Sequence, residues 1–264
     1  MSIRTLLEHH RRQVSRKAWG DLSAFSDALA AAGQLRTVTQ PVSPQLEITA
    51  LSRHSLLRNG PALLFEHPAD HAMPVLGNLF GNEQRILMAL ELESRADLRR
   101  LGGAFAFLRN PDLPDTLGKA FDALPEFARL AHAPLVPRDS APWQDTVIEG
   151  PDVDLGALPI TTCWPDDAGP LITWGLVVTR GPNKPRINLA IYRLQLIGSN
   201  RLIMRWLAHR GGAQDFREFQ AEHPGEPFPV AVVIGADPAT LLAAVTPVPD
   251  TLSEYAFAGL LRGR

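Results

Sequence analysis

The sequence has very little cysteine: Cys163 is the single one among 264 residues, so an internal disulfide is excluded. Such low cysteine usage is typical of proteins in a reducing compartment. Long apolar runs are also missing, since none approaches the roughly 20 residues of a membrane-spanning helix. The basic residues 1–20 lack the continuous apolar core and the small-residue cleavage site of a secretory signal. These absences predict a soluble protein of the cytoplasm.

Neither sign of charge is in large excess. The sequence has 26 Lys and Arg residues and 28 Asp and Glu residues, which gives a net charge of −2 at pH 7. Such a chain has no global field to hold nucleic acid, so we expect no nucleic-acid partner and only local anion sites. A nucleophile elbow, a P-loop, a G-x-G-x-x-G fingerprint and an H-E-x-x-H motif are all absent from the sequence. The hydrophobic fraction of 45% suffices for a sizeable core.

The residues that are present divide the chain into two halves with different patterns. The first half reads as mixed α/β, with helices expected at 21–35, 43–60, 93–110 and 115–132 and strands at 35–42, 62–66 and 73–80. The second half is richer in strands, expected at 145–150, 171–181, 187–213 and 228–236, with helices at 213–223, 237–245 and 251–264. A Pro-rich connection at 133–144 predicts a boundary near residue 135, between domains 1–135 and 136–264.

Residues 187–213, INLAIYRLQLIGSNRLIMRWLAHRGGA, read as a β-hairpin that turns at 198–200 and ends on Gly211-Gly212. In one interpretation its arginines simply lie on the wet face of a sheet. In the other, the terminal glycines let bare backbone approach an anion, for which arginine supplies forked donors. The cationic and metal-competent side chains of the segment are Asn188, Arg193, Arg201, Arg205, His209 and Arg210.

Three further groups are candidates for chemistry. Asp166 and Asp167 could pair in acid–base or metal chemistry, although the surrounding Pro and Gly residues favour a turn. His67 and His71 have the spacing of a helical metal pair, although the proline after His67 favours a loop. Glu254 opens the last expected helix, as an ordinary helix-start glutamate or as a ligand. The residues alone therefore indicate an α/β protein with an anion site, and a hard metal beside it.

Taken together, residues 160–213 and 235–263 closely resemble the UbiD family of prenylated-FMN-dependent decarboxylases. The segments PALLFEHP and MPVLGNLFG of the first half are similar to that family too, so the resemblance extends over essentially all 264 positions. Within the family, the match is nearest to the 4-hydroxy-3-polyprenylbenzoate decarboxylases of ubiquinone biosynthesis. The resemblance implies an N-terminal α/β domain followed by a flavin-binding split β-barrel that is incomplete at the C-terminus.

The resemblance also implies the site residues. Asn188, His209 and Glu254 match the family's metal ligands, and this donor set suits Mn²⁺, which would hold the cofactor phosphate with a monovalent cation such as K⁺ nearby. Asn188 and Arg193 would point to opposite faces of a regular strand, so we expect a bulge there or a cofactor that wraps the strand. The implied contacts to prenylated FMN are Ile191, Tyr192, Arg193, Arg205, Trp206, Leu207, Arg210 and Gly211.

Arg193 matches the arginine of the family's Glu-Arg-Glu catalytic group, which implies that it orients the substrate carboxylate. The implied reaction removes CO₂ from 4-hydroxy-3-polyprenylbenzoate to give 2-polyprenylphenol, with the flavin as electron sink. The family's acidic catalytic residues fall beyond residue 264, so we expect these residues alone to bind cofactor weakly and not to decarboxylate.

The implied partners are a polyprenylated aromatic acid, a flavin prenyltransferase that supplies the cofactor, further copies of the full-length chain in a homo-oligomer, and the inner face of the cell membrane. Three alternatives stay open. The substrate could be another aromatic or α,β-unsaturated acid, or the protein could be a non-catalytic flavin-binding module. In the third, it is a scaffold without a ligand, and Arg193, Arg205 and Arg210 form a solvated face.

Overall fold

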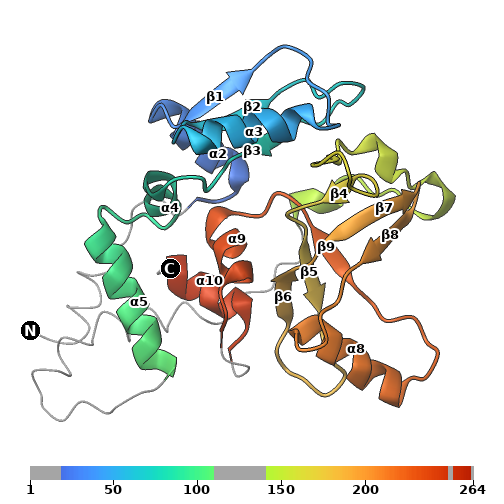
Figure 1. Ribbon diagram of the computed structural model, residues 1–264. Coiled ribbons are helices and arrows are strands. Elements are labelled where there is room, and N and C mark those ends of the chain that lie inside the picture. The colour runs from blue at the N-terminus through green and yellow to red at the C-terminus, as the bar shows by residue number, and fades with distance from the viewer. Residues whose placement is uncertain (1–18, 110–140, 249–251, 263–264) are drawn as a thin grey trace, which may run out of the picture.

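The computed structural model describes residues 19–109, 141–248 and 252–262, whose arrangement is shown in Figure 1. Helices alternate with short strands, which confirms the predicted α/β fold class. The expected helix at 115–132 and the expected boundary near residue 135 lie outside the described residues.

The first sheet has the order β1-β2-β3. Strands β1 (Leu35–Val38) and β2 (Ala62–Phe65) run parallel, and β3 (Val75–Gly77) pairs antiparallel with β2. Helices α2 (Leu22–Ala31) and α3 (Glu47–Leu57) lie against this sheet. These strands and helices, together with α5 (Arg95–Arg109), match the elements expected in the first half.

Local sequence explains where α2 begins and which face it buries. The Asp21 carboxylate accepts a hydrogen bond from the Ala24 N–H at 2.7 Å and so caps the first turn. Phe25 and Leu29, four residues apart on one face, are both fully buried. Gly33 follows the helix with φ +67°, a conformation that glycine adopts without strain. The pattern at 21–35 therefore predicts this helix correctly.

Two further sheets, both antiparallel, form the second half. One contains β4 (Leu171–Ile172), β7 (Leu194–Gly198) and β8 (Arg201–Met204) in the order β4-β7-β8. The other contains β5 (Leu176–Thr179), β6 (Asn188–Ile191) and β9 (Ala231–Val233) in the order β6-β5-β9. The chain passes between these sheets from β4 to β5 and again from β6 to β7.

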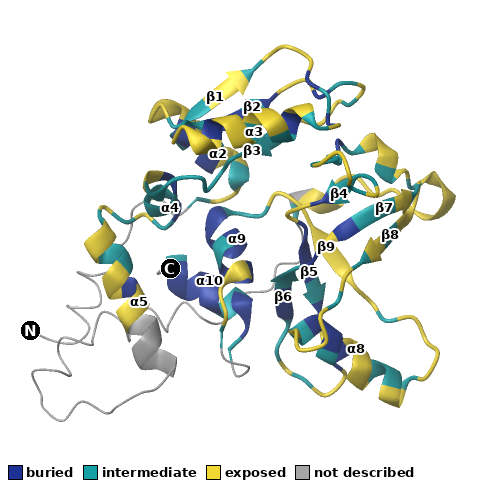
Figure 2. Cartoon of the chain, in the orientation of Figure 1, coloured by how far each residue is buried: buried dark blue, intermediate teal, exposed yellow. Residues whose placement is uncertain are grey.

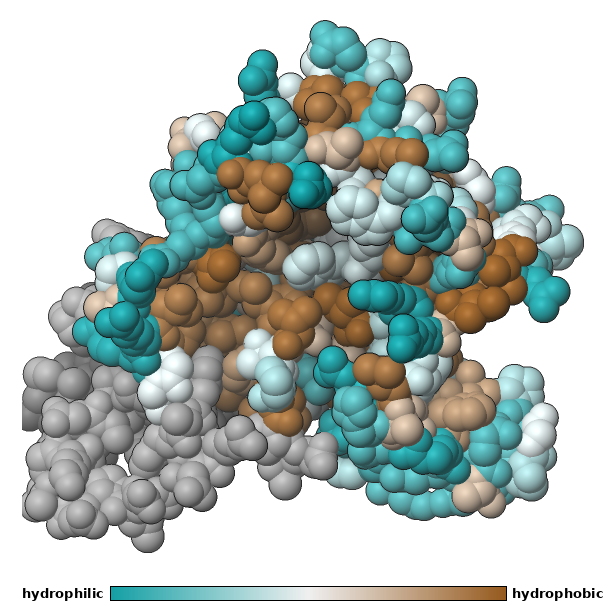
Figure 3. Space-filling model, viewed as in Figure 1, coloured by the Kyte–Doolittle hydropathy of each residue, from teal (hydrophilic) through white to brown (hydrophobic). Residues whose placement is uncertain are grey.

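Three helices complete the second half: α8 (Gly211–Glu222), α9 (Pro238–Val245) and α10 (Glu254–Arg262). Helices α9 and α10 pack on each other in the middle of the molecule and are buried along most of their length (Figure 2). Figure 3 shows apolar side chains over these two helices, between the more hydrophilic surfaces of the first sheet and of α8.

One hydrophobic cluster joins the two halves. Leu241 of α9 packs with Leu176 of β5 and Leu189 of β6, and this cluster also includes Leu79 and Phe80 from the first half. The side chains that position β6 therefore belong to the same core as the N-terminal part. No helix among the described residues is long and apolar enough to cross a bilayer.

Some expectations for both halves are wrong. The strand expected at 145–150 does not form, and its last residue, Gly150, begins a short 3₁₀ helix, Gly150–Asp152. Helix α4 (Glu83–Ala89) was not expected, although Asn82 caps it by accepting from the Arg85 N–H at 2.9 Å. The hairpin is limited to β7 and β8, because 188–191 belongs to the other sheet and α8 begins at 211.

The break after β6 also corrects the expected relation between Asn188 and Arg193. They do not lie on one strand, because β6 ends at Ile191 and β7 begins at Leu194 in another sheet. The irregular register lies later, between Leu196 and Gly198. A change of sheet at 192–193, rather than a bulge, separates the two side chains.

Candidate cofactor and metal site

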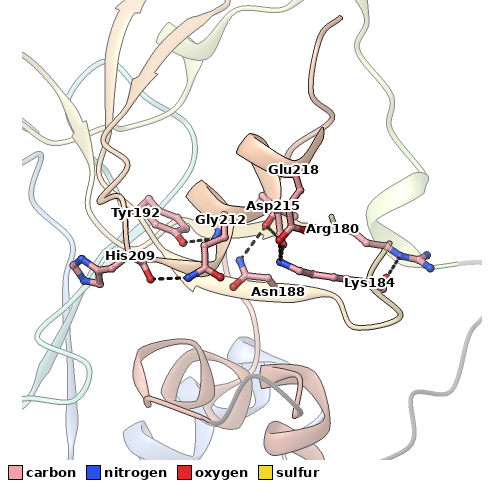
Figure 4. Close-up of polar contacts among 10 residues, drawn as sticks. Arg180, Lys184, Asn188, Tyr192, His209, Gly212, Asp215 and Glu218 are labelled. Carbon is pink, nitrogen blue, oxygen red and sulfur yellow. Dashed lines mark hydrogen bonds and ion pairs between the residues drawn. The ribbon is translucent and has the colours of Figure 1, made fainter. Parts of the chain in front are cut away.

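Asn188 begins β6 and is paired in register with Thr179 of β5. Both side chains are almost completely buried, with 3% and 2% exposure. The Asn188 Nδ2 group donates to Thr179 Oγ1 at 3.0 Å, and Thr179 Oγ1 in turn donates to Asp215 Oδ2 at 2.8 Å (Figure 4). Because buried polar groups are costly unless they are hydrogen-bonded, this chain fixes the Asn188 side chain.

The carboxylate at the end of this chain is itself paired. Asp215, on the inner face of α8, is 1% exposed, and its Oδ1 accepts from Lys184 Nζ at 3.0 Å. Glu218, one turn further along α8, accepts from the same ammonium group at 2.9 Å. Burial lowers the pKa of Lys184, but the hydrogen bonds to Glu218 and Asp215 outweigh it and raise this pKa overall. Lys184 thus compensates the buried Asp215 charge.

Glu254, the first residue of α10, is 9% exposed and reaches β6. Its Oε2 accepts the N–H of Leu189 at 3.0 Å. Burial raises the pKa of Glu254, the hydrogen bond from Leu189 and the charge of Arg186 lower it, and the charge of Asp215 raises it further. The structure therefore brings Glu254 to the residue next to Asn188. The helix dipole alone does not explain this placement, because the carboxylate bonds to a different element.

His209 lies in the loop after β8 and is exposed. Its main-chain carbonyl accepts a hydrogen bond from Gln214 Nε2 at 3.2 Å. In Figure 4 the imidazole lies on the side of the His209 backbone that is remote from Asn188. The structure therefore bonds the Glu254 carboxylate to the main chain of the residue after Asn188, whereas the His209 ring points away from Asn188.

The two glycines at the start of α8 allow close contact with these groups. A Cβ at Gly211 would lie 2.2 Å from Asn188 Oδ1, and a Cβ at Gly212 would lie 2.8 Å from the Trp206 ring and 3.0 Å from the Tyr192 hydroxyl. The Gly212 N–H donates to this hydroxyl at 3.0 Å. The glycine pair thus permits α8 to begin directly against Asn188 and Tyr192.

Tyr192 and Trp206 form the floor next to this helix start. Their rings stack with centroids 5.4 Å apart and an interplanar angle of 19°. Burial raises the pKa of Tyr192, and the bond from Gly212 and a hydrogen bond with Asn188 partly offset this rise. Trp206 is half-buried and also contacts the rings of Phe216 and Phe228.

The remaining expected cofactor contacts lie around this centre. Ile191 is half-buried in the core cluster with Leu176 and Leu189. The main-chain carbonyl of Arg193 accepts the Arg205 N–H at 3.0 Å, which holds the two residues side by side. The side chains of the other contacts are exposed, and they belong to Arg193, Arg205, Leu207 and Arg210.

The other candidate groups are separate from this site. Asp167 Oδ2 accepts the N–H groups of Cys163 and Trp164 at 3.1 and 2.9 Å, which makes a turn, as the surrounding Pro and Gly residues indicate. His67 and His71 lie in a loop rather than on a helix. A cavity of about 440 Å³ lies elsewhere, between residues 43–46, 69–71 and 160–170.

Comparison with protein families gives two matches. Residues 26–105 match the 3-octaprenyl-4-hydroxybenzoate carboxy-lyase N-terminal domain of UbiD, and residues 135–264 match the corresponding Rift-related domain. The chain belongs to the UbiD family. The second match contains Asn188, His209 and Glu254, whose side chains are described above.

Solved structures of UbiD-class enzymes are similar to this chain along most of its length. The closed form of vanillic acid decarboxylase from Sedimentibacter hydroxybenzoicus is 28% identical, with a TM-score of 0.76 over 93% of this chain and 49% of that one. An evolved dimeric form of HmfF from Pelotomaculum thermopropionicum in complex with prFMN is 30% identical, with a TM-score of 0.73 over 92% and 50%. The apo 3,4-dihydroxybenzoic acid decarboxylase from Klebsiella pneumoniae is 26% identical, with a TM-score of 0.71 over 92% and 49%.

This UbiD-family chain thus spans about half the length of the solved structures that it matches. Sequence reasoning missed the buried network behind its Asn188, namely Thr179, Lys184 and Asp215. A signal was present, because Asp215 is three residues after Gly212 and four before Phe219, which places an acid on the inward face of the helix. A buried acid requires a partner, and the sequence did not show which residue would supply it.

Proposed function

We propose that this chain is the cofactor-binding part of a prenylated-FMN-dependent decarboxylase that acts on an aromatic carboxylic acid. Membership of the UbiD family supports the class of reaction, and the HmfF structure with prFMN supports the cofactor. The observation that carries the site is at the start of β6. There the Glu254 carboxylate accepts the N–H of Leu189, directly after Asn188, and Asn188 lies against the glycine-rich beginning of α8.

The donor chemistry fits a divalent cation bound to the cofactor phosphate. Asn188 offers a carboxamide oxygen and Glu254 a carboxylate, and both are donors that Mn²⁺ accepts. A cation would offset the burial cost of the Glu254 charge, and the main-chain N–H groups that open α8 favour an anion nearby. His209 would complete this ligand set after its ring turns inward, and K⁺ would occupy a neighbouring position.

The other residues of the site would hold the flavin and the substrate. Tyr192 and Trp206 provide an aromatic floor, and the exposed guanidinium groups of Arg193, Arg205 and Arg210 can pair with phosphate or carboxylate. The remaining proposed flavin contacts are Ile191, Leu207 and Gly211. When bound, prenylated FMN supplies the electron sink for the loss of CO₂. In this assignment Arg193 orients the substrate carboxylate, and it is the catalytic residue that this chain contributes.

The finer assignment names the substrate and partners. Among aromatic acids we favour 4-hydroxy-3-polyprenylbenzoate, converted to 2-polyprenylphenol in ubiquinone biosynthesis, because the matching family models carry the related octaprenyl name. Vanillic and 3,4-dihydroxybenzoic acids, which name two of the similar enzymes, are the competing substrates. A flavin prenyltransferase would supply the cofactor, the long lipid tail of the substrate would bring the protein to a membrane surface, and the full-length protein would form a homo-oligomer.

The test is co-expression of the chain with a flavin prenyltransferase, followed by mass spectrometry and measurement of bound manganese and phosphorus. We expect flavin, metal and phosphorus in equal stoichiometry, and we expect N188A to lose all three. The matched control is N183A, because Asn183 is an exposed asparagine whose side chain bonds to Glu222 of α8. Absence of flavin from the wild type, or equal retention by N188A, would contradict the proposal. Flavin retention by the full-length protein without CO₂ release from any aromatic acid would instead favour a binding module.

A further inference from the structure

In the hydrogen-bond chain Asn188–Thr179–Asp215, each bond has a fixed donor and a fixed acceptor. This order determines how the Asn188 carboxamide is turned in the candidate site. Each of the three side chains is more than nine-tenths buried, so solvent cannot exchange their partners. An ionised carboxylate can only accept hydrogen bonds, and Asp215 is paired with the Lys184 ammonium group at 3.0 Å. The hydroxyl of Thr179 has a single proton, which it donates to Asp215 at 2.8 Å. Thr179 is therefore left with acceptor capacity alone toward Asn188.

This order determines which end of the Asn188 carboxamide faces Thr179. Only the NH₂ end can donate, and Nδ2 lies 3.0 Å from Thr179 Oγ1. The oxygen end must then point the other way, and Oδ1 indeed lies where a Cβ of Gly211 would come within 2.2 Å. If the carboxamide were flipped, its oxygen would face a hydroxyl that has no proton left, and its NH₂ group would face the metal position. A cation can be ligated only by the oxygen end.

We propose that Asp215 is a positioning residue that acts through Thr179 to hold the Asn188 carboxamide with its oxygen toward the divalent cation. The presence of the cation rests on the proposed function, whereas the orientation of the amide does not. Lys184 completes the arrangement, because its charge keeps an acceptor-only carboxylate in the interior. Residues that orient metal ligands in this way typically change metal affinity by about 10- to 100-fold when they are replaced.

The first measurement needs no metal. In the metal-free protein, we expect the Asn188 side-chain NH₂ protons to show stronger nuclear Overhauser contacts to the Thr179 methyl group than to the Gly211 α protons. In D215N, the new carboxamide can donate to Thr179, so we expect a second Asn188 orientation to appear, with stronger contacts to Gly211. Wild-type contacts that are stronger to Gly211 instead, or a D215N pattern identical to that of the wild type, would overturn the proposal.

The second measurement is Mn²⁺ affinity by electron paramagnetic resonance in the presence of FMN. We expect T179V and D215N to bind Mn²⁺ about 10- to 100-fold more weakly. T179S should restore wild-type affinity, because it keeps the hydroxyl and loses only a methyl group. The control is E218Q, which removes the other partner of Lys184 and leaves Thr179 untouched. If D215N does not fold, both measurements are made with T179V and T179S instead.

The two measurements separate the two proposals. Mn²⁺ binding that N188A leaves unchanged would contradict the proposed function, and the metal-free contacts would still decide the amide orientation. Mn²⁺ binding that N188A abolishes, but that T179V and D215N leave unchanged, would overturn the positioning role of Asp215 and leave the proposed function intact.

Discussion

At the scale of single residues, the candidate site depends on two positions without a side chain, the glycines that begin α8. Gly211 and Gly212 let the first turn of α8 lie against Asn188 and Tyr192, and a methyl group at either position would enter occupied space. The sequence showed the glycine pair and indicated a close backbone approach. It did not show that the nearest neighbour of Gly211 is the carboxamide oxygen of Asn188, because this contact joins residues 23 positions apart through the fold.

Gly211→Ala should therefore be costly. The added Cβ would lie 2.2 Å from Asn188 Oδ1, so the carboxamide or the start of α8 must shift. Overpacking of this kind costs about 1–3 kcal/mol, which chemical denaturation can measure. The matched control is Gly102→Ala in α5, where a Cβ meets nothing within 4 Å. That substitution should stabilise by about 0.5–1 kcal/mol through helix propensity. Equal effects of the two substitutions would contradict the close approach.

Glu254→Gln should have opposite effects on stability and on metal binding. Burial raises the pKa of Glu254, so its charge at neutral pH opposes folding in the absence of a cation. Glutamine keeps an oxygen that can accept from Leu189 and removes the charge. We expect the melting temperature of the metal-free protein to be unchanged or raised, and Mn²⁺ affinity to fall. A purely structural glutamate would instead give a lower melting temperature and unaltered Mn²⁺ binding.

At the scale of elements, α10 has a structural task and, in the proposed function, a functional one. Its first residue is Glu254, and its remaining inward residues, among them Phe257 and Leu260, form the core cluster shared with α9. The position of the carboxylate beside β6 is therefore set by apolar packing further along the same helix. Loss of this packing should loosen the site without touching any group that contacts a ligand.

Leu260→Ala tests this dependence. Leu260 is 1% exposed, and removal of a buried leucine side chain costs about 2–5 kcal/mol. Leu57 at the end of α3 is 65% exposed, so Leu57→Ala should change the free energy of unfolding by no more than about 0.5 kcal/mol. A Leu260→Ala protein as stable as Leu57→Ala would show that α10 is not docked as described.

The contact between α4 and α5 should depend on pH. Glu83 bonds to Arg95 across the two helices, and this bond holds the pKa of Glu83 below its usual value, against a smaller effect of burial. A lowered folded-state pKa contributes stability above the unfolded-state pKa, and this contribution is lost as pH falls through the folded-state pKa. Between about pH 5 and 3, the melting temperature of the wild type should fall more steeply than that of E83Q. Parallel curves would show that the pair contributes nothing.

Periodicity predicted most helices and strands, because amphipathic segments such as 22–31 fold as their local pattern dictates. Periodicity failed where tertiary contacts determine the secondary structure of a segment or the sheet to which it belongs. Residues 145–150 have the apolar content of a strand but form none, and 187–193 splits from 194–204 because the chain changes sheets between them. Asn188 and Glu254 were candidates from the sequence alone, and only the family resemblance implied that they belong to one metal site. Asp215 was missed because the identity of its partner depends on the fold.

At the scale of the whole molecule, the two halves share one core. Leu241 packs in one hydrophobic cluster with Leu189, from the sheet that contains Asn188, and with Phe80 of the first half. The N-terminal half therefore packs against the core that holds β6 in place. We infer that separating the halves would expose the core around Leu176 and Leu189. This UbiD-family chain covers about half the length of similar solved enzymes. In the proposed function it contributes the cofactor and metal side of the active site.

The most direct test is an anomalous difference map at the manganese edge, from crystals of the chain grown with FMN and Mn²⁺. We expect one peak in ligand contact with Asn188 Oδ1 and the Glu254 carboxylate, with the His209 ring turned toward it and the phosphate of FMN beyond it, near Gly211. A peak remote from Asn188 and Glu254, or FMN bound with no manganese between its phosphate and these residues, would contradict the account.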